Sequence, residues 1–252
     1  MRNLHKAYYK DYFANLNLGY LIGNGQEPKT EIKRRNSQLT SPNLLQTIPA
    51  NTSVNQKFSL KIAYPGLVTG IGINHEAKIE GEFKLGVHFD YTYGMPVVYG
   101  SSVKGVLRAW FREFYKPTET QPSVDDAFND IFEGKNTNGP KSIYNRDIFF
   151  DAVITEADSK GRILCSDSIT PHGGVNRDNP LKNPIPITFL KIAPGCKLEF
   201  RFKLVDTQIG DKTFSADDKR KLFKEILTTV GVGAKTNVGY GQFEKEQICQ
   251  NI

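Results

Sequence analysis

The segment from Tyr99 to Lys116 limits the possible folds most, because two kinds of residue recur in it with helical spacing. Its apolar residues fall on one stripe of a helix that turns by about 100° per residue. This stripe consists of Val103, Val106, Leu107, Trp110, Phe111 and Phe114. The basic stripe beside it consists of Lys104, Arg108, Arg112 and Lys116. The pattern predicts a helix over 101–116 that buries one face and keeps a cationic face beside it.

The first turn of this predicted helix carries the donors of an anion-binding site. Ser101 or Ser102 is a suitable N-cap, and Lys104 follows within the same turn. Gly105 lies in the helix interior, where glycine costs about 1 kcal/mol relative to alanine. We therefore expect another backbone or a large ligand against this turn. Helix N–H groups, two hydroxyls and a lysine suit a phosphate backbone, and a solvated basic face is the alternative.

The remaining periodicities favour an α+β fold with a mostly antiparallel sheet. Alternating or continuous apolar runs predict strands at 57–64, 83–91, 147–155, 162–169, 185–192, 197–206 and 240–248. Helical spacing predicts helices at 5–16, 123–133 and 216–230. Ser215 and Asp218 form a capping-box pattern at the start of the last of these helices. Strands and helices do not alternate as regular βαβ units, which favours the α+β class.

Residues 1–56 have a different character from the rest of the chain. After the short predicted helix, residues 23–43 are polar and rich in residues that break helices, so we expect a long loop there. The first alternating strand pattern begins at Lys57. We therefore expect an N-terminal extension over 1–56, packed on a single domain that spans 57–252.

Charge is distributed unevenly along the chain, whose net charge is +6. Residues 1–60 hold eight Lys and Arg against three acids, and residues 117–170 hold five against ten. This asymmetry predicts a basic surface suited to a polyanion and an acidic surface suited to solvent or a basic partner. The alternative is an ordinary soluble surface with no such role.

Composition excludes several classes of protein. With 38% hydrophobic and 24% charged residues, the chain is neither disordered nor a coiled coil. No apolar stretch approaches the ~18 residues of a membrane span, and the N-terminus lacks an apolar signal core. The 3 cysteines lie far apart without a CxxC pair, so we expect a reducing, cytoplasmic setting and no zinc ribbon. The sequence predicts no cofactor and no metal site.

A second informative segment, residues 231–243, follows the predicted helix at 216–230. Glycines permit positive φ and close backbone approach, so successive N–H groups can turn toward an anion. Four glycines here flank a Lys-Thr-Asn centre: Gly231, Gly233, Gly239 and Gly241 around Lys235, Thr236 and Asn237. The order helix, loop, strand excludes a Walker A loop and a dinucleotide fingerprint, both of which open a helix. A plain helix-to-strand turn is the alternative.

Four motifs together resemble a known family. The glycine segment has the form G-h-G-x-x-x-x-x-G-h-G, and residues 100–108 have the form G-S-S-x-K-G-x-x-R. Residues 167–172 follow D-x-x-T-P-H, and residues 183–190 follow N-P-x-P-x-x-F-L. The first two resemble the RAMP superfamily of CRISPR-associated proteins. All four, in this order, resemble the family of sixth Cmr subunits from type III-B effector complexes. The resemblance covers about 60–245, and it does not extend to the first 56 residues or to Gly173–Asn176.

This resemblance implies a ferredoxin-like, RRM-related RAMP core with an antiparallel sheet, insertions and an N-terminal helical and loop extension. It implies a non-catalytic subunit that binds guide RNA and caps the end of the complex holding the 3′ part of the crRNA. The partners would be crRNA, target RNA through it, the backbone RAMP subunit, the small helical subunit and the other terminal RAMP subunit. The RNA-binding residues would be Ser101, Ser102, Lys104, Arg108, Arg112, Gly231, Gly233, Lys235, Thr236, Asn237, Gly239 and Gly241. Such a subunit should grip phosphates and sugars, because target pairing needs free base edges.

Two other functions stay open at this point. A metal-independent endoribonuclease of the same superfamily would need a base near the 2′-hydroxyl and a charge partner. His75, with Lys104 or Lys235, is the best candidate for that chemistry, and His172 is a weaker one. His88 lies in an alternating strand pattern, so we expect it to be structural. The third possibility is a protein scaffold that touches no RNA.

Overall fold

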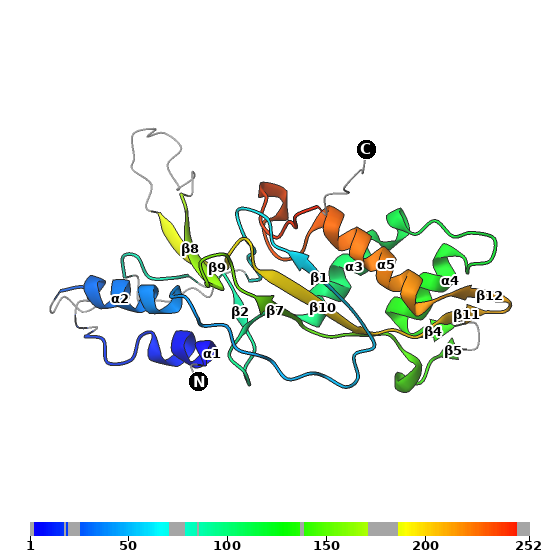
Figure 1. Ribbon diagram of the computed structural model, residues 1–252, viewed down its shortest axis with the longest axis horizontal. Helices are drawn as coiled ribbons and strands as arrows, with labels where there is room; N and C mark the ends of the chain where they lie inside the picture. The colour runs from blue at the N-terminus through cyan, green and yellow to red at the C-terminus, as the bar shows by residue number, and fades with distance from the viewer. Residues whose placement is uncertain are drawn as a thin grey trace.

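The central element of the fold is an antiparallel sheet with the strand order β1-β10-β7-β3-β2 (Figure 1). The computed structural model describes residues 3–17, 19, 26–70, 79–84, 86–136, 139–170 and 186–245. The strands are β1 (Gln56–Lys61), β10 (Lys197–Lys203), β7 (Ala152–Glu156), β3 (Pro96–Val98) and β2 (His88–Phe89), and β6 (Ile148–Phe149) pairs with β10. The predicted antiparallel arrangement is confirmed in every strand pair of this sheet.

The middle strand β10 shows why the alternating pattern produces a two-faced sheet. Leu198, Phe200 and Phe202 are fully buried, whereas the residues between them are half-buried. Phe200 lies opposite Phe58 of β1, and their rings stack with centroids 5.3 Å apart. Because side chains alternate across a strand, the aromatic residues of β10 all point toward one core.

Two helices, α3 (Gly100–Phe114) and α5 (Ala216–Val230), pack on each other and on the sheet (Figure 1). The predicted apolar stripe of α3 is confirmed at Val103, Leu107 and Phe111, which are fully buried. It is wrong at Trp110, which is 42% exposed, and Val106 and Phe114 at its edge are half-buried. The predicted capping box of α5 is confirmed as well. The Ser215 hydroxyl accepts a hydrogen bond from the main-chain N–H of Asp218 at 3.1 Å.

The other elements are insertions and extensions of this core. They are α1 (Leu4–Lys6), η1 (Ala7–Asp11), α2 (Lys29–Leu39), α4 (Val124–Phe128), η3 (Asn129–Glu133), β4 (Lys135–Asn136), β5 (Gly139–Pro140), η4 (Ile143–Asn145), β8 (Leu164–Ile169), β9 (Ile187–Ile192), β11 (Thr207–Ile209), β12 (Lys212–Phe214) and η5 (Thr236–Val238). The predicted strands at 162–169 and 185–192 pair with each other as the hairpin β8–β9. No helix in the described part of the chain is long and apolar enough to cross a membrane.

The predicted loop at 23–43 is wrong for most of its length, because α2 occupies 29–39. Only Ile32 and Leu39 of this helix are buried, so the apolar periodicity is too sparse to detect. An ion pair within the helix and a contact with the N-terminal segment stabilise it instead. The Arg35 guanidinium pairs with Glu31 at 2.7 Å and donates to the carbonyl of Tyr12 at 2.7 Å.

Three other predicted elements are shorter than expected. The helix predicted at 5–16 is only α1 followed by the π-helical turn η1, and the strand predicted at 83–91 is only β2. The strand predicted at 240–248 is reduced to an isolated bridge between Phe243 and Ile62. Tyr8, Phe89 and Phe243 are buried in these segments, and residues 246–248 lie outside the described residues.

The N-terminal residues share the hydrophobic core of the sheet. Tyr8 and Tyr12 are buried, and both hydroxyls bond to the main chain of Phe83. The Tyr8 hydroxyl donates to the carbonyl at 2.7 Å, and the N–H donates to the Tyr12 hydroxyl at 2.8 Å. Buried polar groups cost free energy when unpaired, so these bonds fix the extension in one position.

A buried ion pair joins α5 to the start of β6. The Lys219 ammonium lies 2.7 Å from the Asp147 carboxylate, and both side chains are almost fully buried. Lys219 also donates to the carbonyl of Val205 at 2.5 Å, while Asp147 accepts from the N–H of Val205 at 2.8 Å. Burial raises the pKa of Asp147 and lowers the pKa of Lys219.

Replacing one member of this pair should therefore destabilise the fold strongly. Lys219→Met leaves a carboxylate buried without its cation, which costs about 3–5 kcal/mol. Lys221→Met is the matched control, because Lys221 pairs with Asp217 on the surface, where such pairs contribute about 0–1 kcal/mol. Urea unfolding followed by circular dichroism measures both. Equal midpoints for the two variants would contradict this account.

Candidate nucleic-acid interface

Three glycines of the loop at 231–241 are required by close contacts between main chains. Gly233 has φ +97°, and a Cβ there would lie 2.4 Å from the carbonyl oxygen of Val68. Gly231 and Gly241 have φ of +75° and +69°, and a Cβ on either would lie within 2.5 Å of a carbonyl oxygen. Side chains do not fit at such distances, so the loop folds tightly on itself and on the segment at 66–68.

Hydrogen bonds fix this contact from both sides. The N–H of Ala234 donates to the carbonyl of Val68 at 2.7 Å, and the N–H of Gly241 donates to that of Gly66 at 2.8 Å. The N–H of Val232 donates to the carbonyl of Gly241 at 2.9 Å. The loop is therefore a rigid structure rather than a flexible turn.

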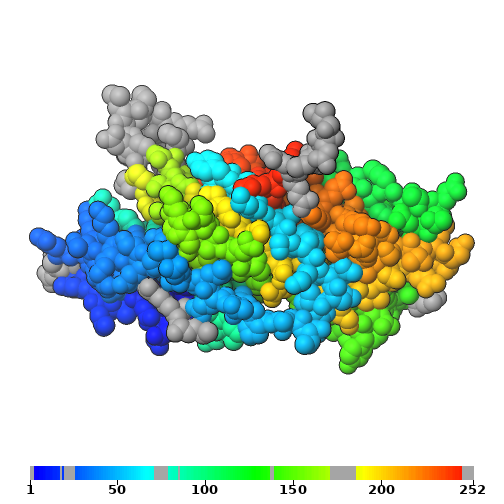
Figure 2. All heavy atoms as spheres, viewed as in Figure 1, coloured from blue at the N-terminus to red at the C-terminus, as the bar shows by residue number. Residues whose placement is uncertain are grey.

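The tip of this loop carries the predicted polar residues and is open to solvent. Lys235 has a left-handed conformation, with φ 61°, and begins the 3-10 turn η5. Lys235 and Asn237 are exposed, and Thr236 is half-buried. The N–H groups of Thr236 and Asn237 lie in the first turn of η5, where the turn itself provides no acceptor. Figure 2 shows atoms of this C-terminal region at the surface, between β1 and α5.

A tyrosine after the tip connects the loop to the β8–β9 hairpin. The Tyr240 hydroxyl donates to Asp167 at 2.8 Å, and the Lys191 ammonium reaches the same carboxylate at 2.5 Å. Lys191 also lies over the Tyr240 ring, 5.6 Å from its centroid. Burial alone would raise the pKa of Asp167, but the hydrogen bonds from Lys191 and Tyr240 outweigh it and lower this pKa. The D-x-x-T-P-H motif indicated Asp167, but its partner Tyr240 could not be found from the sequence.

The predicted basic stripe of α3 lies against the acidic insertion that follows it. Arg108 pairs with Glu133 at 2.5 Å, and Arg112 pairs with Asp125. Both guanidinium groups also lie over the ring of Phe128, at 5.3 and 4.3 Å from its centroid. In Figure 1, α4 and the glycine loop after α5 lie toward opposite ends of α5. The structure therefore does not bring Arg108 and Arg112 together with the glycine loop.

The helix start differs from the prediction. The N-cap of α3 is Tyr99, so Ser101 and Ser102 lie inside the first turn and neither caps it. The N–H of Gly100 donates to the Asp151 carboxylate at 2.7 Å. Glycine is required at this first residue because a Cβ on Gly100 would lie 2.1 Å from the carbonyl oxygen of Phe149. Asp151 thus occupies the amide that a phosphate would use.

The structure also shows what surrounds Lys104 and Gly105 of α3. Lys104 lies over the Phe149 ring, 5.8 Å from its centroid, and is half-buried. No described atom lies within 4 Å of a Cβ built on Gly105. The close neighbour expected at this glycine is therefore absent from the part of the chain that the structure describes.

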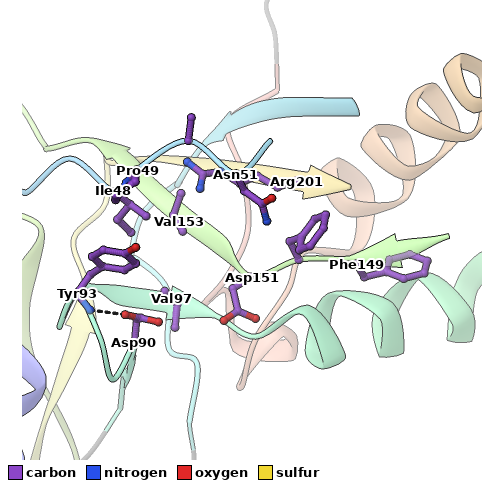
Figure 3. Close-up of a pocket in the computed structure, with 12 residues that line it drawn as sticks. Ile48, Pro49, Asn51, Asp90, Tyr93, Val97, Phe149, Asp151, Val153 and Arg201 are labelled. Atoms are coloured by element: carbon purple, nitrogen blue, oxygen red, sulfur yellow. Dashed lines mark hydrogen bonds between the residues drawn. The ribbon is translucent and has the colours of Figure 1, made fainter. Parts of the chain in front are cut away.

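A groove of about 510 Å³ lies on the sheet face opposite α3 and α5 (Figure 3). Val97 and Val153 form its floor, and the segment at 48–51 forms one wall. Asp90 and Asp151 also line it, with Arg201 on the far side. Two carboxylates in one groove repel phosphate, so this site does not suit a polyanion.

The sequence offered two histidines as catalytic candidates. His75 and His172 lie outside the described residues, as do Pro171 and the residues 183–185 of the fourth motif. His88 is half-buried and stacks on Tyr99, with ring centroids 4.5 Å apart, and burial lowers its pKa. Among the described residues, no group of three or more His, Cys, Asp or Glu could hold a metal ion.

Comparison with known proteins identifies the family. A family model described as the RAMP superfamily matches residues 19–244, which is most of the chain. The chain belongs to the RAMP superfamily. The resemblance noted in the sequence is therefore confirmed, and so is the α+β RAMP fold.

Two curated RAMP proteins and one solved complex are similar to this chain. The CRISPR system CMR subunit Cmr6 of Saccharolobus solfataricus is 28% identical over 169 residues, 66% of this chain and 50% of that protein. The Cmr6 subunit of Pyrococcus furiosus is 28% identical over 232 residues, 70% of this chain and 64% of that protein. The chain thus spans about half to two-thirds of these relatives. A chain in the cryo-EM structure of type III-B Cmr-beta bound to cognate target RNA has a TM-score of 0.52 and 22% identity, covering 75% of this chain and 57% of that one.

Glycine substitutions should separate the packed positions from the open one. Gly241→Ala forces a Cβ to within 1.9 Å of the Val232 carbonyl oxygen at positive φ, so we expect a loss of at least about 1–2 kcal/mol. Gly105→Ala fills open space in a helix and should stabilise the protein by about 0.5–1 kcal/mol. Thermal unfolding of the two variants tests this. A neutral Gly241→Ala would contradict the proposed contact between main chains.

Asp167 should make stability depend on pH in acid. Its pKa is lowered in the folded state, so its contribution is fully present above its unfolded pKa of about 3.9 and is lost as the pH falls through the folded pKa. The difference in free energy of unfolding between the wild type and Asp167→Asn should therefore shrink below about pH 4. A difference that is constant down to that range and below it would contradict the assignment. Chemical unfolding at a series of pH values measures it.

Proposed function

We propose that this chain is a non-catalytic, guide-RNA-binding assembly subunit of a type III-B CRISPR (Cmr) complex. In this role it caps the end that holds the 3′ part of the crRNA, in antiviral defence. The observation that carries the proposal is the solvent-accessible tip of Lys235, Thr236 and Asn237 on a loop fixed by the close main-chain contacts of Gly231, Gly233 and Gly241. Similarity to two Cmr6 subunits supports the same role.

The chemistry of the tip fits a sugar-phosphate backbone. It offers main-chain N–H groups, one flexible ammonium group, a hydroxyl and an amide. The main-chain N–H groups and the ammonium group suit phosphate oxygens, which carry no information about the base. A guide strand held in this way keeps its base edges free for pairing with target RNA. Rigidity lowers the entropy cost of binding, because the loop is already ordered.

The α3 residues enter the proposal with a different energetic cost. The ion pairs of Arg108 and Arg112 are largely exposed, and such pairs contribute only about 0–1 kcal/mol. Replacing the carboxylate partner of either arginine by an RNA phosphate therefore costs little free energy. We keep Ser101, Ser102, Lys104, Arg108 and Arg112 as a second contact region for RNA, separate from the glycine loop.

The proposed partners follow from this role. They are crRNA and, through it, target RNA, together with the backbone RAMP subunit, the small helical subunit and the other terminal RAMP subunit. The exposed acidic side chains of α4, such as Asp125, suit a basic protein surface rather than RNA.

Substitution of Lys235 tests the proposal in the reconstituted complex. The slope of log affinity for guide RNA against log salt concentration should fall by about 0.7 in Lys235→Ala, because one phosphate contact is lost. The triple variant Lys104→Ala/Arg108→Ala/Lys235→Ala should lower it by about 2. Lys212→Ala, an exposed lysine on the β11–β12 hairpin, is the matched control and should change nothing.

Two results would overturn the proposal, one from this titration and one from a cleavage assay. An unchanged salt slope and unchanged guide retention in the triple variant would exclude a phosphate-binding role for these residues. RNA cleaved by the purified chain in EDTA, with cleavage lost in His75→Ala, would favour the endoribonuclease instead.

A further inference from the structure

Five aromatic rings gather on the surface where α1 and η1 meet β2 and the start of α3. We call them the ring platform: His5, Tyr9, His88, Tyr91 and Tyr99. The His5 ring lies 4.5 Å from that of Tyr9 and 5.1 Å from that of Tyr91, between centroids. The His88 and Tyr99 rings stack at 4.5 Å with an interplanar angle of 19°. Burial raises the pKa of Tyr9, and the nearby hydroxyl of Tyr99 raises it further.

The platform is exposed above a rigid base. The Tyr91 side chain is 81% exposed, and Tyr9 and Tyr99 are each 38% exposed. Beneath them, Phe89 is buried and meets the edge of the Tyr9 ring at 6.5 Å. The N–H of Leu4 donates to the carbonyl of Gly94 at 3.1 Å, which fixes α1 to the β2–β3 turn. The rings are therefore held in place before any partner binds.

A series of contacts connects the base of the ring platform to the segment on which the glycine loop packs. Ala234 of that loop bridges to Val68, and the hydroxyl of the next residue, Thr69, accepts from the N–H of His88 at 2.5 Å. A Cβ on Gly70 would lie 2.8 Å from the His88 ring nitrogen, so this glycine lets the ring fit against the loop. The base of the platform and the glycine loop thus pack on the same segment at 66–70.

The chemistry of the platform favours nucleobases over a protein partner. It consists of tyrosines and histidines with polar tips and has no aliphatic member. Lys6 and Lys10 are exposed on the same turns. Aromatic rings with nearby cations bind single-stranded nucleic acids by stacking, which every base permits. We propose that the ring platform stacks unpaired bases of a single-stranded RNA bound by this chain. This inference rests on the proposed function.

Abasic RNA distinguishes stacking from phosphate binding. The full chain is titrated with two oligoribonucleotides of equal length, one with all its bases and one with a run of abasic riboses. The wild type should prefer the RNA with bases by about fivefold or more. Tyr9→Ala/Tyr91→Ala should lose this preference and keep the affinity for abasic RNA and the salt slope. Tyr144→Ala, an equally exposed tyrosine on η4, should retain it.

A second measurement needs no variant. RNA with 5-iodouracil, irradiated on the wild-type chain, should form adducts with ring-platform residues, identified by mass spectrometry. In the binding titration, Tyr9→Phe keeps the ring and should bind as the wild type, which shows that the ring and not the hydroxyl is required.

The possible failures can be told apart. Absence of adducts at these rings, with a base preference that persists in a folded Tyr9→Ala/Tyr91→Ala variant, would overturn the ring platform. The proposed binding of guide RNA at the glycine loop would still be supported if Lys235→Ala lowers the dependence of RNA affinity on salt concentration. If the wild type binds neither RNA in a salt-dependent way, the proposed function fails, and the ring platform fails with it.

Discussion

The contact between two main chains, at Gly233 and Val68, determines the geometry on which the rest of this surface depends. Without side chains, the loop after α5 approaches the segment after β1 closely enough for Ala234 to donate to Val68 at 2.7 Å. This approach fixes the ends of the 3-10 turn and leaves its tip exposed. The same segment then places Thr69 and Gly70 against His88, so a glycine requirement in one loop positions aromatic rings in another part of the chain.

Charge and packing divide the molecule into two regions. The acidic insertion after α3 neutralises two of the four basic residues of that helix through Glu133 and Asp125. Asp151 occupies the first amide of the same helix. Lys235, the cation of the glycine loop, belongs to the second region, which has no part in these ion pairs with the acidic insertion. A polyanion therefore meets the exposed Lys235 at the loop, whereas along the helix stripe it competes with carboxylates for Arg108 and Arg112.

Sequence alone predicted the elements whose apolar period is strong, because periodicity reports burial directly. The stripe of α3, the alternation in β10 and the Ser215 cap of α5 were all readable in this way. It could not predict α2, where only Ile32 and Leu39 are buried, or the contacts of Arg108 and Tyr240 with residues distant in the chain. The polar tip of the site was visible as a motif. The ring platform was not, because His5, Tyr9, His88, Tyr91 and Tyr99 come from three separate segments.

Hydrogen exchange at single amides tests the central claim most directly, because that claim concerns the main chain itself. The full chain is compared with and without guide RNA. The account predicts slower exchange at the N–H groups of Thr236 and Asn237 when RNA is bound, with no change in the β11–β12 hairpin. Unchanged exchange at these two amides under conditions where RNA is bound, with protection elsewhere, would contradict it.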